Sequence, residues 1–155
     1  MRSIAAKLLI VMAIPAIAAF GADLSVGTWK HNAAKSKTTS ANPTKSQTDV
    51  REATPDGGVK ITRTGELADG TPANYSFTYK YDGKEYPVTG APFDVISVKR
   101  IDDYSWSWDV KKTGGKYHVT GRNVVSSDGK TMTQTSKGTD AEGRPMVSTI
   151  VFDRQ

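Results

Sequence analysis

The chain has 155 residues, a hydrophobic fraction of 37% and a formal net charge of +5 at pH 7. It contains no cysteine, which excludes a disulfide scaffold, a thiol nucleophile and thiolate metal sites. A chain of this length forms one domain and buries about two-thirds of its unfolded surface, so its core suffices without cross-links.

The N-terminus has the pattern of a secretory signal peptide. Arg2 and Lys7 precede an apolar run that ends abruptly at Asp23, as a basic n-region, a short h-region and a cleavage site do. We therefore expect a signal peptide over residues 1–22 and a single domain over residues 23–155, periplasmic or secreted. Removal of Arg2 and Lys7 lowers the formal charge from +5 to +3, which does not indicate a nucleic-acid partner.

The cleavage point and the fate of this segment have alternatives. Ala16-x-Ala18 and Ala19-x-Gly21 both place small residues where a signal peptidase needs them. A retained N-terminal anchor is the other interpretation, but the apolar run over 8–22 has 15 residues, whereas a spanning helix needs about 20.

Turn dipeptides divide the remaining sequence at short intervals. Asp-Gly and Gly-Gly pairs favour β-hairpins because tight primed turns need a positive φ at their central residues. They are Asp56-Gly57-Gly58, Asp69-Gly70, Asp82-Gly83, Gly114-Gly115, Asp128-Gly129 and the related Glu142-Gly143.

Between these turns the residues alternate with a period of two, and no segment has a convincing period of 3.6. The pattern predicts strands over 26–32, 46–53, 58–66, 73–82, 84–88, 94–101, 105–112, 116–126, 130–138 and 145–154. Most connections are short, so strands adjacent in sequence should pair. A meander of eight to ten strands closes into an up-and-down barrel, which removes free edges. We predict this all-β barrel; strand counting leaves a two-sheet sandwich as the alternative.

Two further features concern the connections. Residues 33–46, "AAKSKTTSANPTKS", form a long stretch of small and polar residues, which predicts an irregular loop, either a binding loop or a solvated one.

The pattern Gly65-x-x-Ala68-Asp69-Gly70-x-Pro72 returns as Gly138-x-x-Ala141-Glu142-Gly143-x-Pro145. We interpret this echo as the reuse of one turn design, with duplication of a half-barrel as the alternative.

The stretch "VGTWKHNAAKSK" carries a resemblance to a known family. Gly27, Thr28 and Trp29 at the start of the first strand, ahead of an all-β meander, resemble the lipocalin and wider calycin pattern. In that pattern the Trp closes one barrel end and stacks on a basic residue of the last strand, and "IVFDR" supplies Arg154. The resemblance implies a Trp29–Arg154 cation–π contact that plugs the barrel, contributing about 1 kcal/mol.

A longer likeness concerns most of the sequence after residue 22. "GTWKHNAAKSK", "YKYDGKEYPVTG" and "DGKTMTQTSKGTDAEGRP" resemble a group of small exported bacterial proteins that are lipocalin-like and have no assigned activity. The resemblance implies the fold and a bacterial periplasmic or secreted location.

Catalytic and metal-binding patterns are scarce. The two histidines, His31 and His118, lie far apart in sequence and lack the spacing of a zinc site. Asp102-Asp103 could serve glycoside hydrolysis, but they lie between two predicted strands, where Asp is an ordinary turn former. The sequence contains no nucleophile motif, P-loop or dinucleotide fingerprint. We expect a protein that is not an enzyme and uses neither a metal nor a cofactor.

Aromatic residues are the informative class. In a barrel the inward face of a strand either fills the core or lines a cavity, and tyrosine suits both because its ring is apolar and its tip polar. The candidate ligand-binding residues are Tyr75, Phe77, Tyr79, Tyr81, Trp106 and Trp108, with Arg100 or Arg122 as partners for a charged headgroup.

These observations lead to a ranked set of functions. The first is a monomeric, non-catalytic protein that holds a small, partly apolar molecule inside the barrel. The second is a protein-interaction or envelope-surface module with a solid barrel. The third is carbohydrate binding by exposed Trp106 and Trp108.

Overall fold

The computed structural model describes residues 22–155, so the expected signal peptide lies outside the described residues apart from Ala22. The elements are β1 (Gly27–His31), the 3-10 helix η1 (Ala33–Lys35), β2 (Lys37–Thr38), β3 (Thr44–Ala53), β4 (Val59–Leu67), β5 (Tyr75–Tyr79), β6 (Asp82–Pro87), β7 (Val95–Asp102), β8 (Ser105–Lys111), β9 (His118–Val125), β10 (Thr131–Thr139) and β11 (Pro145–Arg154). The ten predicted strands are confirmed, with ends that differ by three residues at most.

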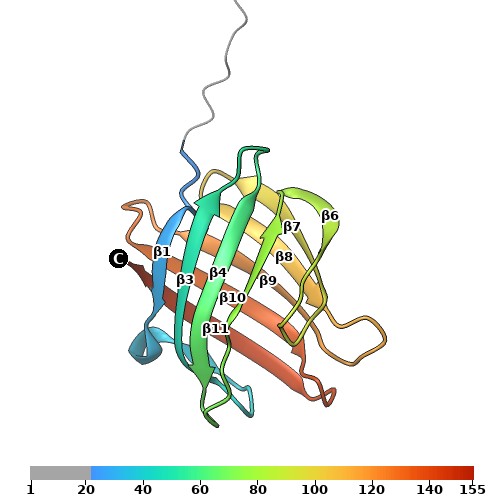
Figure 1. Cartoon of the computed structure of the whole chain (residues 1–155). Coiled ribbons are helices and arrows are strands. Elements are labelled where there is room, and N and C mark those ends of the chain that lie inside the picture. The colour runs from blue at the N-terminus through green and yellow to red at the C-terminus, as the bar shows by residue number, and fades with distance from the viewer. Residues whose placement is uncertain (1–21) are drawn as a thin grey trace, which may run out of the picture.

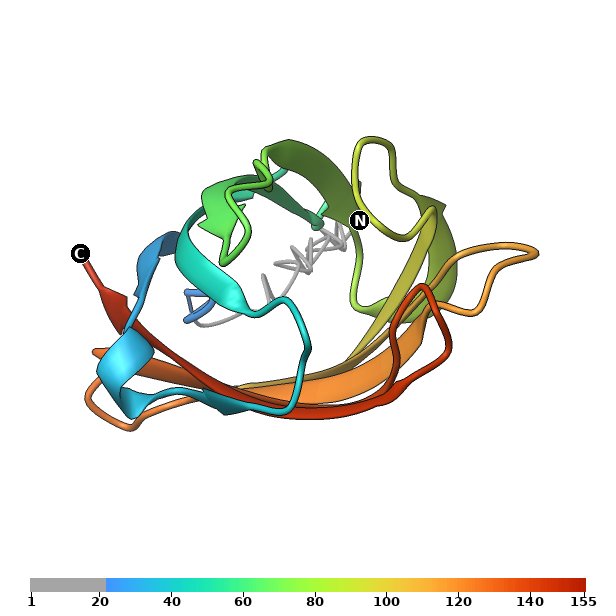
Figure 2. The same ribbon diagram turned by 90° about the horizontal axis from the view of Figure 1, so that it is seen from below.

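The strands form one antiparallel sheet that curls into a nearly closed barrel (Figures 1 and 2). Their order is β5-β4-β3-β1-β11-β10-β9-β8-β7-β6. β1 pairs with β11, with Trp29 opposite Arg154, so the first and last long strands meet. The predicted all-β, up-and-down barrel is confirmed, and the sandwich alternative is wrong.

The barrel has one seam, between β5 and β6, which share no ladder within the described chain. Asp82-Gly83 was expected to form a hairpin turn there, and this expectation is wrong. Asp82 instead begins β6 and accepts the Lys84 N–H and the Tyr86 hydroxyl through its own carboxylate, so the chain turns locally without pairing the two strands. Phe93 lies near the seam and packs edge-on against Tyr75 and Phe77 of β5.

The segment over 33–46 is more ordered than the sequence indicates. After β1 the chain turns through η1, and β2 then pairs with β11 at Ser148 and Thr149. β2 therefore continues the pairing of β11 where β1 stops. The remaining irregular connection runs from residue 39 to residue 43 before β3 begins.

The hairpin turns use glycine at one position only. No non-glycine residue in the described range has a positive φ, whereas Gly57, Gly70, Gly129 and Gly143 have φ between 71° and 87°. Primed turns with two positive φ values are thus absent from this part of the chain, contrary to the prediction. The Gly57 N–H donates to the Thr54 carbonyl, which is the geometry of a type I turn closed by a left-handed glycine.

The two echo segments form equivalent hairpins, β4–β5 and β10–β11. Leu67 donates to Thr71 in one turn, and Asp140 donates to Arg144 in the other. The first glycine of each echo, Gly65 or Gly138, faces a carbonyl of the neighbouring strand so closely that a Cβ would collide with it. This shared geometry explains the repeated sequence pattern as the same turn used in two hairpins.

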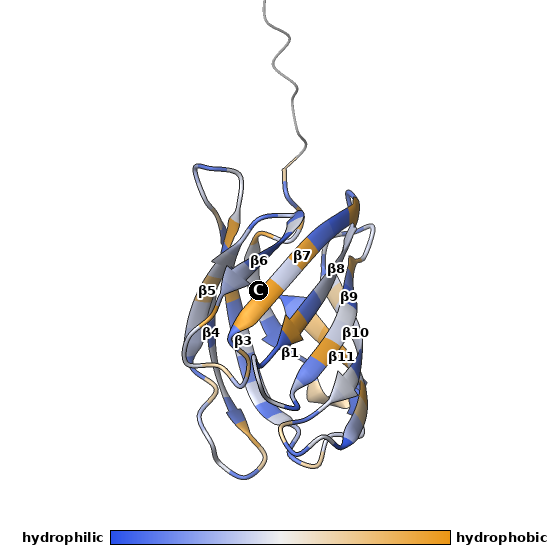
Figure 3. Ribbon diagram, turned by 90° about the vertical axis from the view of Figure 1, so that its right-hand side faces the viewer, coloured by the Kyte–Doolittle hydropathy of each residue, from blue (hydrophilic) through white to orange (hydrophobic). Residues whose placement is uncertain are grey.

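Inward side chains form the core, and the strands carry alternating apolar and polar bands (Figure 3). Two ends can be distinguished. The closed end contains the turns over 54–58, 102–105 and 126–130 together with residues 22–26, and its buried side chains include Trp29 and Trp106. The mouth contains the turns over 67–74, 88–94, 112–117 and 140–144. Figure 2 views the barrel from the mouth.

Candidate functional site

The barrel interior contains two adjoining chambers. The inner chamber has a volume of about 120 Å³, and the mouth chamber has a volume of about 510 Å³. The same five side chains line both chambers and mark their junction: Arg63, Tyr75, Trp108, Tyr117 and Gln134. These side chains therefore form the boundary between the two chambers.

Five of the six predicted aromatic liners border the inner chamber: Tyr75, Phe77, Tyr79, Trp106 and Trp108. The rings of β5 follow one another along the strand, with 6.1 Å between the centroids of Tyr75 and Phe77 and 6.2 Å between those of Phe77 and Tyr79. Tyr81 is not in the lining. Its ring packs edge-on between Tyr79 and Trp106, at 5.5 and 6.1 Å.

Trp108 is fixed at the junction of the chambers by its neighbours. Its indole Nε1 donates to Asn123 Oδ1 at 2.6 Å. A Cβ on the facing Gly121 would collide with the indole ring, so the glycine provides the space in which the ring lies. The tryptophan therefore has one defined position beside both chambers.

A buried polar network follows the inner face of β3 and β4. Arg63 donates through Nε and Nη2 to the two carboxylate oxygens of Asp49, at 2.8 and 2.7 Å. Gln47 Nε2 donates to the same two oxygens at 3.1 Å, and Arg63 Nη1 donates to the Tyr75 hydroxyl at 3.0 Å. Burial lowers the pKa of Arg63, but the Asp49 carboxylate outweighs this and raises it overall. The network fixes the polar side of the junction.

Arg51 lies one inward position further along β3 and is 4% exposed. Its Nη2 donates to the Tyr79 hydroxyl at 2.5 Å, and its guanidinium lies 5.0 Å from the centroid of the Trp106 ring. Its Nε is buried and has no hydrogen-bond partner within residues 22–155. Arg51 lines the inner chamber at the side nearest the closed end.

The closed end is sealed by Trp29 and Arg154. Trp29 is 0% exposed, and the Arg154 guanidinium lies 4.2 Å from the centroid of its ring. Arg154 also donates to the carbonyls of Leu24, Val26 and Gly129, each at 2.6 Å. The contact implied by the family resemblance is present, and the same arginine ties the N-terminal residues of the domain to the barrel.

Of the two arginines proposed for a headgroup, neither lines an interior chamber. Arg100 lies at the closed end, 3.6 Å from the centroid of the Tyr81 ring, and its Nη2 donates to Asp23 at 3.0 Å. Arg122 points outward from β9, and its Nη2 donates to the Ser105 hydroxyl at 3.0 Å. Inward and outward positions alternate along β9, and Asn123 occupies the inward one. Arg122 therefore does not border either interior chamber, where a headgroup partner was expected.

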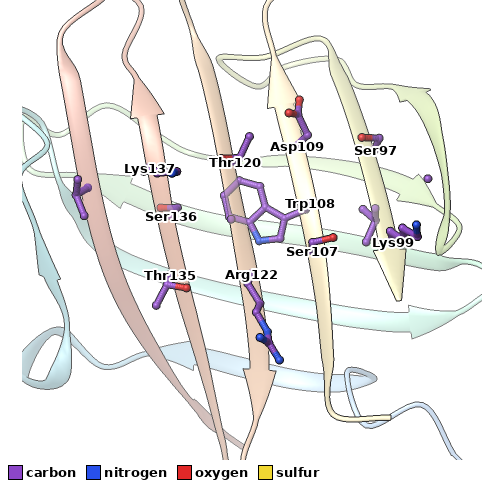
Figure 4. Close-up of a pocket in the computed structure, with 14 residues that line it drawn as sticks. Ser97, Lys99, Ser107, Trp108, Asp109, Thr120, Arg122, Thr135, Ser136 and Lys137 are labelled. Atoms are coloured by element: carbon purple, nitrogen blue, oxygen red, sulfur yellow. The ribbon is translucent and has the colours of Figure 1, made fainter. Parts of the chain in front are cut away.

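A second hollow, of about 650 Å³, lies on the outer surface of β7–β10 (Figure 4). Its side chains are mostly polar or charged and include Lys99, Asp109, Arg122 and Lys137, and Trp108 also borders it. Trp106 does not reach this surface because it is 2% exposed, so it cannot stack on a sugar there. One member of the tryptophan pair, Trp108, borders this hollow and the other does not, so the geometry gives no support to a sugar platform made of both rings.

The other residues considered for chemistry lie apart. His118 pairs with Asp109 on the surface at 2.9 Å, whereas His31 is half-buried and donates or accepts at the Ser36 hydroxyl. Asp102 accepts the Tyr104 N–H in the β7–β8 turn, as expected of a turn former. In the described part of the chain no three His, Asp or Glu residues gather as metal ligands. No helix among residues 22–155 has the length and apolarity needed to cross a membrane.

The polar interior was missed by sequence reasoning. β3 reads "TKSQTDVREA", and its inward residues are Gln47, Asp49 and Arg51, while Val50 faces outward and is 37% exposed. A signal was present: Asp49 and Arg51 lie on one face of this strand and Glu52 on the other, so either orientation places a charge inside the barrel. The sequence alone does not show that Arg63 lies opposite Asp49 in the ladder.

The fold has solved counterparts, although no protein-family model and no curated protein matches the chain. Among solved structures, it is similar to the wild-type fluorescent protein UnaG, with a TM-score of 0.53, 14% identity and coverage of 84% of this chain and 96% of the other. It is similar to a fatty acid binding protein of Schistosoma mansoni in complex with arachidonic acid, with a TM-score of 0.54, 12% identity and coverage of 85% and 96%. At these identities the likeness shows the fold alone, an up-and-down β-barrel.

Proposed function

We propose that the protein is an exported, non-catalytic binding protein that holds a small, partly apolar ligand in the barrel. The observation that carries the proposal is the pair of adjoining chambers, of about 510 and 120 Å³. Ligand sites are concave, mostly apolar and aromatic, with a few placed polar groups. The wall of Phe77, Tyr79 and Trp106 beside Arg51 and Arg63 matches that description.

The structural neighbours support the same proposal. The fatty acid binding protein of Schistosoma mansoni, whose fold this chain shares, was solved in complex with arachidonic acid. A barrel of this kind therefore accommodates a long apolar molecule with one polar end. The proposal for this chain rests on its own chambers, since the identity is 12%.

Native mass spectrometry of the protein purified from its own host tests the proposal. We expect a fraction of the protein to carry a small molecule that is released on denaturation, and its mass identifies the ligand class. Repeated recovery of ligand-free protein, without a fluorescence response to added apolar compounds, would overturn it.

Trp108 supplies the main fluorescence readout, because it borders both chambers, whereas Trp106 borders the inner chamber alone and Trp29 borders neither. A bound ligand should change the emission of the wild-type protein. Trp108→Phe should reduce that change and keep a conservative ring in the same place, and the part that remains reports on Trp106 in the inner chamber.

A solid interaction module is the second candidate. The outer hollow on β7–β10 and the exposed apolar side chains Ile101, Tyr104 and Val124 favour it. The same native spectrum separates the two functions: a stoichiometric protein complex supports this candidate, whereas a bound small molecule supports the first.

Export is a separate part of the proposal, suggested by the residues before Asp23. When the full chain is expressed in a bacterium, the intact mass of the protein recovered outside the cytoplasm should correspond to cleavage close to Ala22. A mass that retains the first 22 residues would contradict export by a cleaved signal.

A further inference from the structure

We propose that Arg51 binds the carboxylate of an acidic ligand at the inner end of the barrel. This inference rests on the proposed binding function and names the class of ligand. The observation that carries it is a guanidinium that is 4% exposed, borders the inner chamber and has a buried Nε without a hydrogen-bond partner in the described structure.

Asp49, the nearest buried acid, accepts no hydrogen bond from Arg51. Both Asp49 oxygens accept bonds from Arg63 and from Gln47. Arg63 and Asp49 therefore form a bidentate pair that neutralises itself. No carboxylate of residues 22–155 lies within salt-bridge distance of Arg51.

The groups that do touch Arg51 are neutral. Burial raises the pKa of Tyr79 well above its ordinary value, although the nearby guanidinium acts in the opposite direction. Tyr79 thus keeps its proton while it accepts the bond from Arg51 Nη2. The Trp106 ring offers cation–π attraction at 5.0 Å and no acceptor atom. The single charge of Asp49 is shared by two arginines, Arg51 and Arg63, so the inner chamber keeps a net positive charge. Such a buried charge is expensive to keep without a partner.

A carboxylate matches this guanidinium in charge and in shape. Arginine offers parallel N–H groups that meet the two oxygens of one carboxylate, and such charge-assisted bonds are the stronger kind. The inner chamber, about 120 Å³, has room for the headgroup and a few carbon atoms. The rest of the ligand then extends past Trp108 into the mouth chamber, about 510 Å³. An acyl chain and an aromatic acid share this chemistry.

Two pairs of compounds test the assignment by titration of tryptophan fluorescence. Decanoate is compared with 1-decanol, and 3-phenylpropionate with 3-phenylpropan-1-ol, at pH 7 and fixed salt. The members of each pair have similar tails and differ in the headgroup charge. We expect the acid of at least one pair to bind roughly 10- to 100-fold more tightly than its alcohol, and the preferred pair distinguishes an aliphatic from an aromatic acid.

Arg51→Met should abolish this preference while the alcohol still binds. Lys60→Gln is the matched control, because it removes one positive charge from the exposed face of the neighbouring strand β4, and it should leave the preference unchanged. Without ligand, Arg51→Met should unfold at the same urea concentration as the wild type or at a higher one, since an unpaired buried charge is replaced by an apolar chain.

Each outcome separates the headgroup assignment from the binding function. Equal binding of acids and alcohols by the wild-type protein would overturn the role of Arg51 and leave the binding function standing, and this comparison needs no variant. A preference for acids that persists in Arg51→Met would overturn it as well. Binding of none of the four compounds would overturn the proposed function itself.

Discussion

The two ends of the barrel differ in how their side chains are used. At the closed end Trp29 and Trp106 are buried, and Arg154 donates to three backbone carbonyls. At the mouth, polar side chains such as Gln134 and Ser148 stand around an open chamber. Stability is not uniform across a fold, and binding regions are drawn from its less stable parts. The comparison indicates that one end holds the barrel together and the other is available for a ligand.

The largest expected change in the free energy of unfolding comes from removing a buried ring at the closed end. Trp29→Ala should lower the free energy of unfolding by about 3–5 kcal/mol, because it leaves a cavity where a fully buried ring was packed. Met146→Ala, a partly buried residue of the mouth chamber, should cost about 1 kcal/mol. Urea denaturation of both variants measures the difference, and equal losses would contradict the division between the two ends.

Two glycines give a smaller and better matched comparison. Gly27 at the closed end and Gly70 at the mouth both have positive φ, 133° and 87°. A Cβ at Gly70 meets nothing within 4 Å, whereas one at Gly27 collides with the Arg154 guanidinium. Gly70→Ala should therefore cost about 1 kcal/mol from backbone strain alone.

Gly27→Ala should cost about 2–3 kcal/mol, because Arg154 is also displaced from a carbonyl that it binds. Thermal unfolding monitored by circular dichroism checks both substitutions. A loss for Gly70→Ala as large as that for Gly27→Ala would show that Arg154 adds nothing beyond the strain.

Acid should weaken the closed end slightly. Burial raises the pKa of Asp23, but the bond from the Ser25 N–H and the charge of Arg100 outweigh it and lower the pKa below 3.8. A carboxyl with a lowered pKa in the folded state stabilises the fold above its unfolded pKa, and this contribution is lost as the pH falls through the folded pKa. The pair is partly exposed, so its contribution is about 0.5 kcal/mol.

Asp23→Asn isolates that effect. The wild type should be more stable than the variant at about pH 6, and the difference should disappear as the pH falls below the lowered pKa of Asp23. Urea midpoints of the two proteins measured across this range are the test, and a difference that does not change with pH would exclude Asp23 as its source.

Much of the architecture could be predicted from the sequence because local signals agree with the fold. Alternation in "NYSFTYKY" and "SWSWDV" identifies the inward aromatic faces, and turn glycines separate the strands. Asp82-Gly83 has the same letters as the true hairpin turns, yet β5 and β6 do not pair. Whether a turn joins two paired strands depends on the closure of the whole barrel, which a dipeptide does not encode.

The site was predicted less completely, for a physical reason. The aromatic residues that line the chamber can be recognised in the sequence, because large rings at every second position indicate an inward face. Arg51 and Asp49 do not, since charged residues in a strand ordinarily face solvent and only the ladder places Arg63 beside Asp49. Arg100 and Arg122 were predicted from their charge alone. Arg100 lies at the closed end and Arg122 on the outer face, so neither borders a chamber.

The seam between β5 and β6 leaves two strand edges whose backbone groups have no ladder partner in the described structure. Such edges are templates on which further strands can add, and proteins discourage this with short strands, charges and prolines. β5 has five residues, and β6, "DGKEYP", carries exposed charges, an irregular register and Pro87 at its end. The opening in the barrel wall is thereby protected against the edge-to-edge stacking that leads to fibrous aggregates.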